Sequence, residues 1–400
     1  MAKLANRLAL VKESPTLAVM AKASAMKSQG QDVVILAAGE PDFDTPEFIK
    51  QAAIDAINQG KTKYTNSSGL PELKQAVINK FANENNLQYK ANQILVSCGA
   101  KHSIFNALET LINPGDEVII PAPFWVSYPD MVLLCDGVPK LVVNGIEDSF
   151  KLSAAKLEQA ITSKTKAIIL NSPNNPTGMS YDAGELSQIA KVLDKHPNVY
   201  AICDDIYEHL NYTGNKYTTL VNVAPQLSDR IIVVNGVSKA YAMTGWRIGY
   251  AACGDVEIIK AMSDIQSQST SNPCSISQYA AIAALNNGRT GLDYMNEAFI
   301  KRHDYVYSTI TQIKGLRCIR AQGAFYVFFD CSEAIANLYN AGKIKAKTDL
   351  AFANYLLEDY LLALVPGSAF GLDDHMRISF AASMEELEKG LSRIKKSLDF

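Results

Sequence analysis

The 400-residue sequence lacks the features that mark several large classes of protein. It has no apolar run that approaches the length of a membrane span, so we expect no transmembrane segment. Its net charge of -3 provides no basic surface of the kind that binds nucleic acid or acidic membranes. The N-terminal stretch carries charges among its apolar residues and has no signal-peptide core. We therefore expect a cytoplasmic protein with neither nucleic acid nor a membrane as its partner.

Several local motifs are missing as well. The seven cysteines are scattered, odd in number and without a Cys-x-x-Cys pair, which argues for reduced thiols rather than disulfides or zinc. The five histidines show no metal-ligand spacing, so we expect no metal site. No Gly-x-Gly-x-x-Gly follows the first strand of the expected sheet, which argues against a dinucleotide-binding dehydrogenase.

The chain is long enough for a large core and two domains. From residue 93 onward, apolar strand-like runs alternate with helical patterns, which predicts an α/β fold with a mostly parallel, doubly wound sheet. In such sheets, functional residues lie just past the carboxyl ends of the strands. The seven expected strands are 93–97, 117–121, 140–143, 166–170, 199–203, 230–234 and 248–252.

The segments before and after this alternating region are expected to be mostly helical, with a few isolated strands. Ser383 and Glu386 have the spacing of a capping box, so a last helix should begin there. The remaining expected elements of the first part are a helix from 16, a strand at 32–38, and a helix, a loop and a second helix between 46 and 90. Those of the last part are long helices to about 313, a strand at 323–329, an exposed segment at 332–347, a helix at 350–362 and an edge strand at 376–380.

The run from 235 to 249 carries most of the chemistry. Lys239 follows an apolar strand and a glycine that permits a turn, with Ser238 before it and Arg247 eight residues after it. A crowded cationic setting favours a partly neutral, nucleophilic amine, as Schiff-base chemistry requires. Ser238 and Arg247 suit a phosphate, the first by a hydrogen bond and the second by its charged fork. The alternative is a solvated lysine in a turn.

Other strand ends carry residues that suit a ligand. Gly99 and Ala100 open a helix whose free N–H groups suit a phosphate. Trp125 suits stacking on a flat heteroaromatic ring, or else it fills the core. The loop 171–178 is rich in turn formers, and its amides suit a ring oxygen or a carboxylate. Asp204 ends a buried strand, where a carboxylate is costly without a cation such as a protonated pyridine nitrogen.

Two further residues suit a substrate carboxylate. Gly39 permits close approach to a backbone N–H, or it is a simple turn glycine. Arg377 stands between hydrophobic neighbours on a strand, where an unpaired guanidinium is expensive. Its fork fits a carboxylate in bidentate geometry, and the alternative is an internal salt bridge.

These motifs resemble those of the class I and II aminotransferases over nearly the whole chain, and among them the prokaryotic I-beta aspartate aminotransferases. The resemblance implies a fold-type-I transferase that uses pyridoxal 5′-phosphate. It implies a large cofactor-binding domain at 46–290 and a smaller α/β domain at 1–45 and 291–400. The motifs are Gly39-Glu-Pro-Asp-Phe, Tyr64, Trp125-Val-Ser-Tyr, Ser172-Pro-Asn-Asn-Pro-Thr-Gly, Asp204-x-x-Tyr207, Ser238-Lys239 and Arg377-Ile-Ser.

Carried over residue by residue, the resemblance implies roles around the cofactor. Lys239 binds it covalently and acts as general base and acid, while Asp204 keeps its ring nitrogen protonated. Tyr207 and Asn175 bind the ring hydroxyl oxygen, and Trp125 stacks on the ring. The homodimer that the resemblance implies has shared active sites. The residues at or beside the phosphate are Gly99, Ala100, Lys101, Ser238, Arg247 and the partner subunit's Tyr64.

The same resemblance implies how a substrate is held. Arg377 binds its α-carboxylate, with help from Asn175, Trp125 and the Gly39 backbone. The implied reaction is a ping-pong transfer of an amino group between L-aspartate and 2-oxoglutarate, which gives oxaloacetate and L-glutamate. An aminotransferase for aromatic or other amino acids, or a C–S lyase, would share the fold.

A dicarboxylate substrate needs a second cation besides Arg377. Lys101 is the best candidate, because a lysine is a flexible point charge that tolerates carboxylates of different geometry. In the resembled subgroup, a lysine at the Lys101 position and a threonine at the Thr16 position accompany prephenate activity, and Lys12 lies nearby in the sequence. The alternative is that the lysines are solvated and Thr16 caps a helix. We expect amination of prephenate to arogenate as a second activity.

Overall fold

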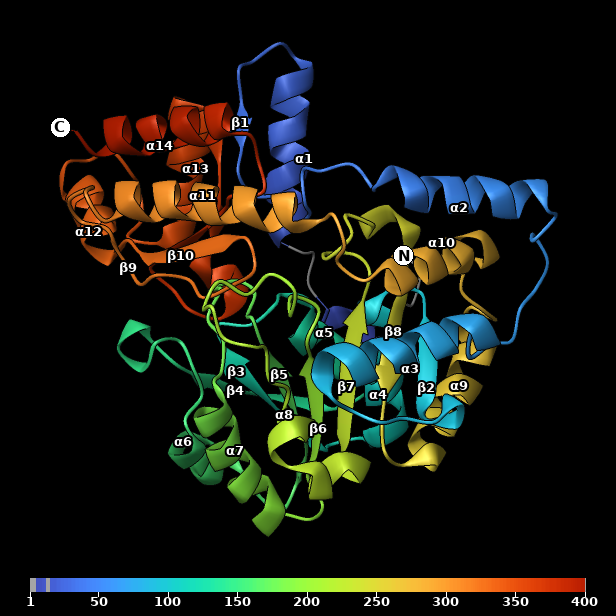
Figure 1. Ribbon diagram of the computed structural model, residues 1–400. Helices are drawn as coiled ribbons and strands as arrows, with labels where there is room; N and C mark the ends of the chain where they lie inside the picture. Colours follow the sequence, from blue (N-terminus) through green and yellow to red (C-terminus); the bar gives the residue numbers. More distant parts are fainter. Residues whose placement is uncertain (1–4, 12–14, 400) are drawn as a thin grey trace.

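The computed structural model describes residues 5–11 and 15–399 (Figure 1). Its main feature is a seven-stranded sheet with the order β2-β8-β7-β6-β5-β3-β4. All neighbouring strands are parallel except β8, which runs antiparallel to β2 and β7. The strands are β2 (Ile94–Ser97), β3 (Glu117–Ala122), β4 (Val138–Val143), β5 (Thr165–Asn171), β6 (Tyr200–Asp204), β7 (Ile231–Gly236) and β8 (Gly249–Ala252). The expected mostly parallel sheet is confirmed, with every strand within two residues of its expected bounds.

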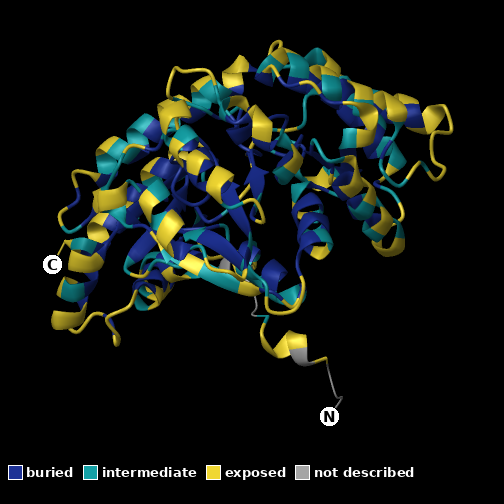
Figure 2. Ribbon diagram, turned by 90° about the horizontal axis from the view of Figure 1, so that it is seen from below, coloured by how far each residue is buried: buried dark blue, intermediate teal, exposed yellow. Residues whose placement is uncertain are grey.

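Both faces of this sheet are covered, because successive side chains of a strand alternate between its faces. Val234 points to one face, where the core is completed by α4 (Ala100–Leu111), α5 (Ser127–Leu134) and α9 (Val256–Ser269). Val233 points to the other, where the core includes α3 (Pro71–Asn85), α6 (Ala154–Ala160), α7 (Ala183–Lys195), α8 (Leu220–Val223) and α10 (Ser275–Asn287). The inner strands of the sheet are buried on both faces and are continuous apolar runs, which is why the sequence revealed them, whereas the edge strand β4 is exposed or half-buried along its length. Figure 2 shows the buried strands inside and the exposed outer faces of the helices.

A second, four-stranded sheet has the order β12-β13-β10-β9 and is antiparallel throughout. Its strands are β9 (Arg317–Cys318), β10 (Tyr326–Asp330), β12 (Val365–Pro366) and β13 (His375–Ser379). The expectation of an edge strand at 376–380 is wrong, because β13 pairs with β10 on one side and β12 on the other. β12 is only two residues long and includes a proline, so its sequence carries no strand pattern. The expected strand at 32–38 is reduced to β1 (Val34–Ile35), which pairs with β11 (Leu362–Ala363).

The remaining helices are α1 (Pro15–Ser28), α2 (Glu47–Asn58), α11 (Asp293–Ile310), α12 (Ser332–Asn340), α13 (Asp349–Tyr360) and α14 (Met384–Leu398). The expectation of an exposed excursion at 332–347 is wrong for its first part, because α12 buries Ala334, Ile335 and Leu338 on one face. The expected start of the last helix is confirmed, since Ser383 is the N-cap of α14 and its hydroxyl accepts a hydrogen bond from the Glu386 N–H at 3.2 Å. No helix in the described ranges is long and apolar enough to cross a membrane.

Candidate active site

A cavity of about 480 Å³ opens where the carboxyl ends of β3, β5, β6 and β7 meet residues of β10 and β13. The rule that parallel sheets place ligands past their strand ends therefore holds here. The cavity brings together eleven of the predicted site residues. They are Gly39, Ala100, Lys101, Trp125, Asn175, Asp204, Tyr207, Ser238, Lys239, Arg247 and Arg377.

Four predicted residues are not among the residues that line this cavity. Gly99 immediately precedes Ala100 and packs beneath Arg247. Tyr64 lies on the connection between α2 and α3, where 91% of its surface is exposed. Thr16 belongs to α1, but its side chain is not among the described parts, and Lys12 lies outside the described residues.

Lys239 follows the end of β7 and extends into the cavity. Its ammonium donates a hydrogen bond to the Gly39 carbonyl oxygen, which belongs to the segment after β1. Its Nζ also lies 5.7 Å from the ring centroids of Tyr207 and Phe325. The hydrogen bond to Gly39 and the two aromatic rings therefore position the amine inside the cavity.

The surroundings of Lys239 favour its neutral form. The pKa of the amine is lowered to about 8, mainly by burial, and the positive charges of Arg247 and Arg377 contribute to the decrease. The carboxylates of Glu40 and Asp204 act in the opposite direction. An amine with such a pKa has an appreciable neutral fraction near physiological pH, so it can act as a nucleophile and as a general base. The alternative of a solvated turn lysine does not describe this side chain.

Asp204 is buried at the end of β6. Its carboxylate accepts hydrogen bonds from the Tyr128 hydroxyl at 2.6 Å and from the Ile206 N–H at 3.3 Å. Burial raises the pKa of this carboxyl to about 6, although both hydrogen bonds oppose the increase. Since neither hydrogen-bond partner carries a positive charge, the site suits a cationic ligand group facing Asp204.

Arg377 lies on β13 and is buried. Its guanidinium donates to the Asn175 side-chain oxygen at 2.9 Å and to the Ala37 carbonyl oxygen at 2.7 Å. It also lies over the rings of Tyr326 and Phe370, 4.4 and 4.9 Å from their centroids. Within the described part of the chain, no carboxylate forms an ion pair with it, so the alternative of an internal salt bridge is not realised. A buried guanidinium with neutral partners suits a carboxylate ligand.

Positive groups gather at the start of α4. Gly99 has a φ of +87°, which favours glycine, and it leaves room for the Arg247 guanidinium; a Cβ at Gly249 would collide with the Ala100 backbone. The Lys101 ammonium lies 4.7 Å from the Trp125 ring centroid. Burial lowers the pKa of Lys101, and the charge of Arg247 adds to this effect. A helix N-terminus flanked by two cations suits a phosphate.

Sequence reasoning missed several residues that line the cavity. Tyr128, which bonds Asp204, was visible three residues after Trp125, yet received no role. Glu40 accepts a hydrogen bond from the Thr244 hydroxyl at 2.8 Å, and nothing in the sequence indicated that pair. Tyr326 was also missed, because it stands in a uniformly apolar strand whose neighbours carry no signature. All three residues were missed for the same reason, which is that each contacts a partner distant in the sequence.

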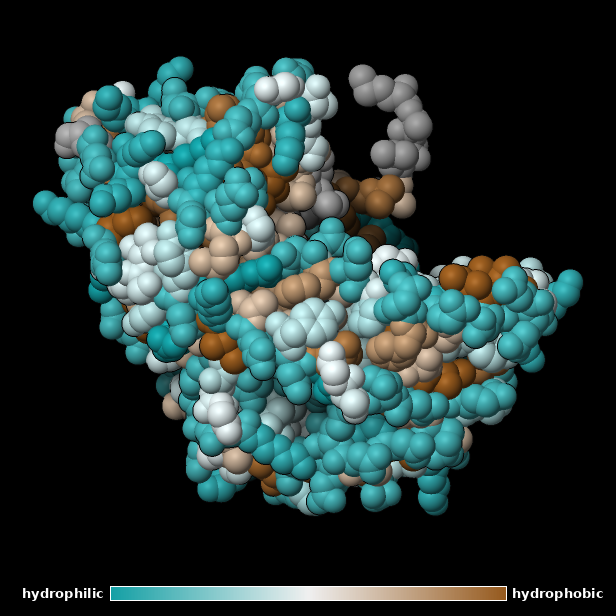
Figure 3. Space-filling view, turned by 45° about the horizontal axis from the view of Figure 1, so that its top comes forward, coloured by the Kyte–Doolittle hydropathy of each residue, from teal (hydrophilic) through white to brown (hydrophobic). Residues whose placement is uncertain are grey.

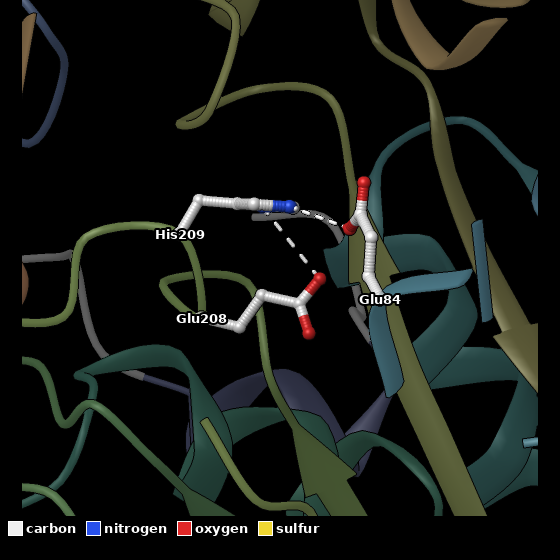
Figure 4. Close-up of side chains that lie close together, drawn as sticks. All are labelled: Glu84, Glu208 and His209. Atoms are coloured by element: carbon white, nitrogen blue, oxygen red, sulfur yellow. Dashed lines mark hydrogen bonds and ion pairs between the residues drawn. The ribbon is translucent and has the colours of Figure 1, made fainter. Parts of the chain in front are cut away.

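Among the described residues, Glu84, Glu208 and His209 form one group with the composition of a metal site (Figure 4). The His209 Nε2 lies 2.8 Å from Glu84, and its Nδ1 lies 3.6 Å from Glu208. However, the buried Lys80 ammonium contacts Glu208 and lies 3.6 Å from Glu84. Lys80 therefore supplies the positive charge that a metal would supply, and we assign no metal to the group.

Comparisons with known proteins agree with this geometry. Residues 31–394 match the family model for aminotransferase class I and II. The aspartate/prephenate aminotransferase of Cereibacter sphaeroides is 52% identical, covering 99% of this chain and 98% of the relative. That of Nitrosomonas europaea is 50% identical, covering 99% of this chain and 100% of the relative. The crystal structure of the aspartate aminotransferase from Rhizobium meliloti matches with a TM-score of 0.95 and 48% identity, over 100% of this chain and 99% of that chain. The chain therefore belongs to the class I and II aminotransferases.

Proposed function

We propose that the protein uses pyridoxal 5′-phosphate to transfer an amino group between L-aspartate and 2-oxoglutarate. The observation that carries the proposal is that one cavity combines a partly buried amine, a buried carboxylate and a buried guanidinium. These are the groups of Lys239, Asp204 and Arg377. Among the described residues, the carboxylate has no ion-pair partner, and the guanidinium donates to neutral oxygens. The printed names of the relatives, which include aspartate, support the choice of substrate.

The residues of the cavity fit the cofactor. When bound, pyridoxal 5′-phosphate supplies an aldehyde that links to amines and a ring that takes up an electron pair. Lys239 would hold the aldehyde carbon, and Asp204 would face the ring nitrogen. Tyr207 and Asn175 would bind the ring oxygen, and Trp125 would cover the ring. The phosphate would be held by Gly99, Ala100, Ser238, Arg247 and the partner subunit's Tyr64, with Lys101 beside it.

The side chains then divide the work of the reaction. Arg377 and the Gly39 backbone orient the substrate by its α-carboxylate. The Lys239 amine, once neutral, removes the proton from the substrate Cα and later returns a proton, as general base and acid. To do so it must leave the Gly39 carbonyl oxygen, with which it bonds in the structure. Asp204 keeps its negative charge facing the ring, so that the electron pair released at Cα is stabilised.

A second cation supports the preference for dicarboxylates. Lys101 and Arg377 line the same cavity, so a substrate with two carboxylates has one cation for each. We propose that prephenate, whose side chain also carries a carboxylate, is aminated to arogenate as a second activity. The names of the Cereibacter and Nitrosomonas relatives, which include prephenate, support this. Thr16 and Lys12 remain predicted contributors to this activity.

We further propose a homodimer with shared active sites. Exposed apolar side chains support the dimer. Phe48, Ile54 and Ile57 are exposed residues of α2, next to the connection that carries Tyr64. Figure 3 shows hydrophobic surface at the end of the molecule where α2 lies. Exposed apolar side chains gathered on one helix are typical of a surface that packs against another protein. Tyr64 would then reach the phosphate of its neighbour.

The domain division proposed is 46–290 for the cofactor and 1–45 with 291–400 for the small domain. It is supported by the two separate sheets and by the pairing of β1 with β11. We also propose a cytoplasmic location. All seven cysteines are free in the structure, as a reducing compartment would keep them.

The test is a panel of amino donors and oxo acids on the purified protein loaded with the cofactor. Aspartate with 2-oxoglutarate should yield oxaloacetate at the highest kcat/KM, and prephenate with glutamate or aspartate should yield arogenate. The Lys239→Ala variant is the control and should lose nearly all turnover. Higher kcat/KM with aromatic amino acids, or release of a thiol from a sulfur amino acid, would contradict the proposal in favour of its alternatives.

A further inference from the structure

Tyr326 lines the cavity but has no role in the proposed reaction. It is the first residue of β10 and is fully buried. β10 belongs to the four-stranded sheet, whereas Tyr207 and Lys239 follow strands of the seven-stranded sheet. Tyr326 is therefore a point at which the smaller sheet touches the groups that would bind the cofactor.

Its hydroxyl contacts Tyr207. The two phenol oxygens are 2.9 Å apart, and the rings meet edge to face with an interplanar angle of 78°. A phenol has a single proton to donate. If Tyr207 donates that proton to the ring oxygen of the cofactor, it must accept the proton of Tyr326. The pair then forms a directed chain, from Tyr326 to Tyr207 to the cofactor.

Its ring contacts Arg377. The guanidinium lies 4.4 Å from the Tyr326 ring centroid, which is within the range of a cation–π interaction. The contact is a consequence of the register of the sheet, because Arg377 pairs with Phe328 and is the diagonal neighbour of Tyr326 on the adjacent strand. The guanidinium also opposes the increase that burial produces in the pKa of Tyr326. A nearby cation makes the phenol a stronger hydrogen-bond donor.

We propose that Tyr326 is a positioning residue that acts on both halves of the site. Its hydroxyl directs the proton of Tyr207 toward the cofactor ring oxygen, and its ring holds the Arg377 guanidinium in place for the substrate carboxylate. The inference rests on the proposed function. It adds that the carboxylate site and the ring-oxygen site are joined through one side chain.

Two substitutions separate the two contacts. Tyr326→Phe keeps the ring over Arg377 and removes the donor to Tyr207. Tyr326→Leu removes both contacts. Tyr212→Phe is the matched control: its hydroxyl bonds the Ala324 carbonyl oxygen, two residues before Tyr326, and it does not line the cavity. The control measures the effect of losing a tyrosine hydroxyl near β10 but outside the cavity.

Two equilibrium measurements on the cofactor-loaded protein read the contacts without turnover. The first is the pH midpoint of the visible absorbance of the bound cofactor. Tyr207, the donor on the ring oxygen, disfavours protonation of the linkage next to it, and a proton received from Tyr326 makes Tyr207 a stronger donor. Tyr326→Phe should therefore raise the midpoint, by at most the roughly 1 pH unit that one whole hydrogen bond contributes. The second is the affinity for maleate, a dicarboxylate without an amino group. It should change little in Tyr326→Phe and fall about threefold to thirtyfold in Tyr326→Leu.

The outcomes are decisive in either direction. An unchanged midpoint in Tyr326→Phe, or an equal shift in Tyr212→Phe, would overturn the role of the hydroxyl. Wild-type maleate affinity in Tyr326→Leu would overturn the role of the ring; if that variant does not fold, Tyr326→Met, which also lacks a ring, takes its place with the same expected loss. If the wild-type protein acquires no visible absorbance with the cofactor, both this inference and the proposed function are wrong. A normal wild-type titration with an unaffected Tyr326→Phe refutes only the inference.

Discussion

Replacing Asp204 with asparagine removes one charge from the centre of the proposed site and little else. The two side chains have nearly the same volume, and the Tyr128 hydroxyl, 2.6 Å from the carboxylate, can donate to an amide oxygen instead. The loss is therefore the negative charge that would face the ring nitrogen of the cofactor. Because Asp204 is buried, water can replace little of that charge.

The size of the effect is set by the environment. Two unit charges about 4 Å apart interact by about 4 kcal/mol at an effective dielectric constant of about 20. Since about 1.4 kcal/mol corresponds to a factor of ten in rate, kcat should fall about a thousandfold. Burial raises the pKa of Asp204 to about 6 in the structure, so the measurement belongs at pH 8, where the wild-type side chain is ionised.

Asp205 provides the matched control. It is the next residue and equally buried, but it faces Thr219 and Tyr217 rather than the cavity. Burial, together with the charge of Glu208, raises its pKa to about 8. At pH 7 most of it is therefore already neutral, and asparagine is a close substitute. Asp205→Asn should keep kcat near the wild-type value.

The assay is kcat for aspartate and 2-oxoglutarate, together with single-turnover formation of oxaloacetate, at pH 7 and at pH 8. The two variants are compared at pH 7, where Asp204 is mostly ionised and Asp205 mostly neutral. Circular dichroism and cofactor content establish that each variant is folded and loaded. Equal losses in the two variants, or a larger loss in Asp205→Asn, would refute the argument that the residue at the strand end carries the charge.

Three further experiments test other parts of the same geometry. Mixing a Tyr64→Ala protein with a Lys239→Ala protein should restore activity in heterodimers, because one site then has both residues and the other has neither; no recovery despite proven subunit exchange would contradict shared sites. Lys101→Met should raise KM for dicarboxylates and prephenate far more than for a neutral apolar amino acid, and equal losses on all substrates would limit Lys101 to the fold or the phosphate. Asp205→Asn should gain stability relative to the wild type as pH rises from 4 to 8. The pKa of Asp205 is about 8 in the folded protein and 3.8 ordinarily, so the wild type loses stability across that interval, whereas asparagine does not titrate. A difference in melting temperature that does not grow with pH would show that Asp205 does not titrate this way.

The sequence by itself determined the large sheet and the chemistry at its strand ends. Its inner strands are buried on both faces and are uninterrupted apolar runs, so each was visible locally, and the half-exposed edge strand β4 was visible from its valines and leucine. The lysine run was equally local, since Ser238, Lys239 and Arg247 lie within ten residues of one another. What the run could not reveal was the environment of the amine, which depends on Glu40 and Arg377 as well.

Only the tertiary structure decided how the smaller sheet completes the site. Arg377 meets Asn175 across 202 positions, and Tyr326 meets Tyr207 across 119. Such contacts leave no periodic pattern in either partner, because each strand is apolar for its own packing reasons. The position of β13 inside its sheet could not be predicted either, because the strand β12 beside it is only two residues long. Nor does any local motif connect Lys80 with Glu208, the carboxylate that it contacts. Local sequence shows which surfaces a segment buries, whereas the residue that meets each surface is set by the path of the whole chain.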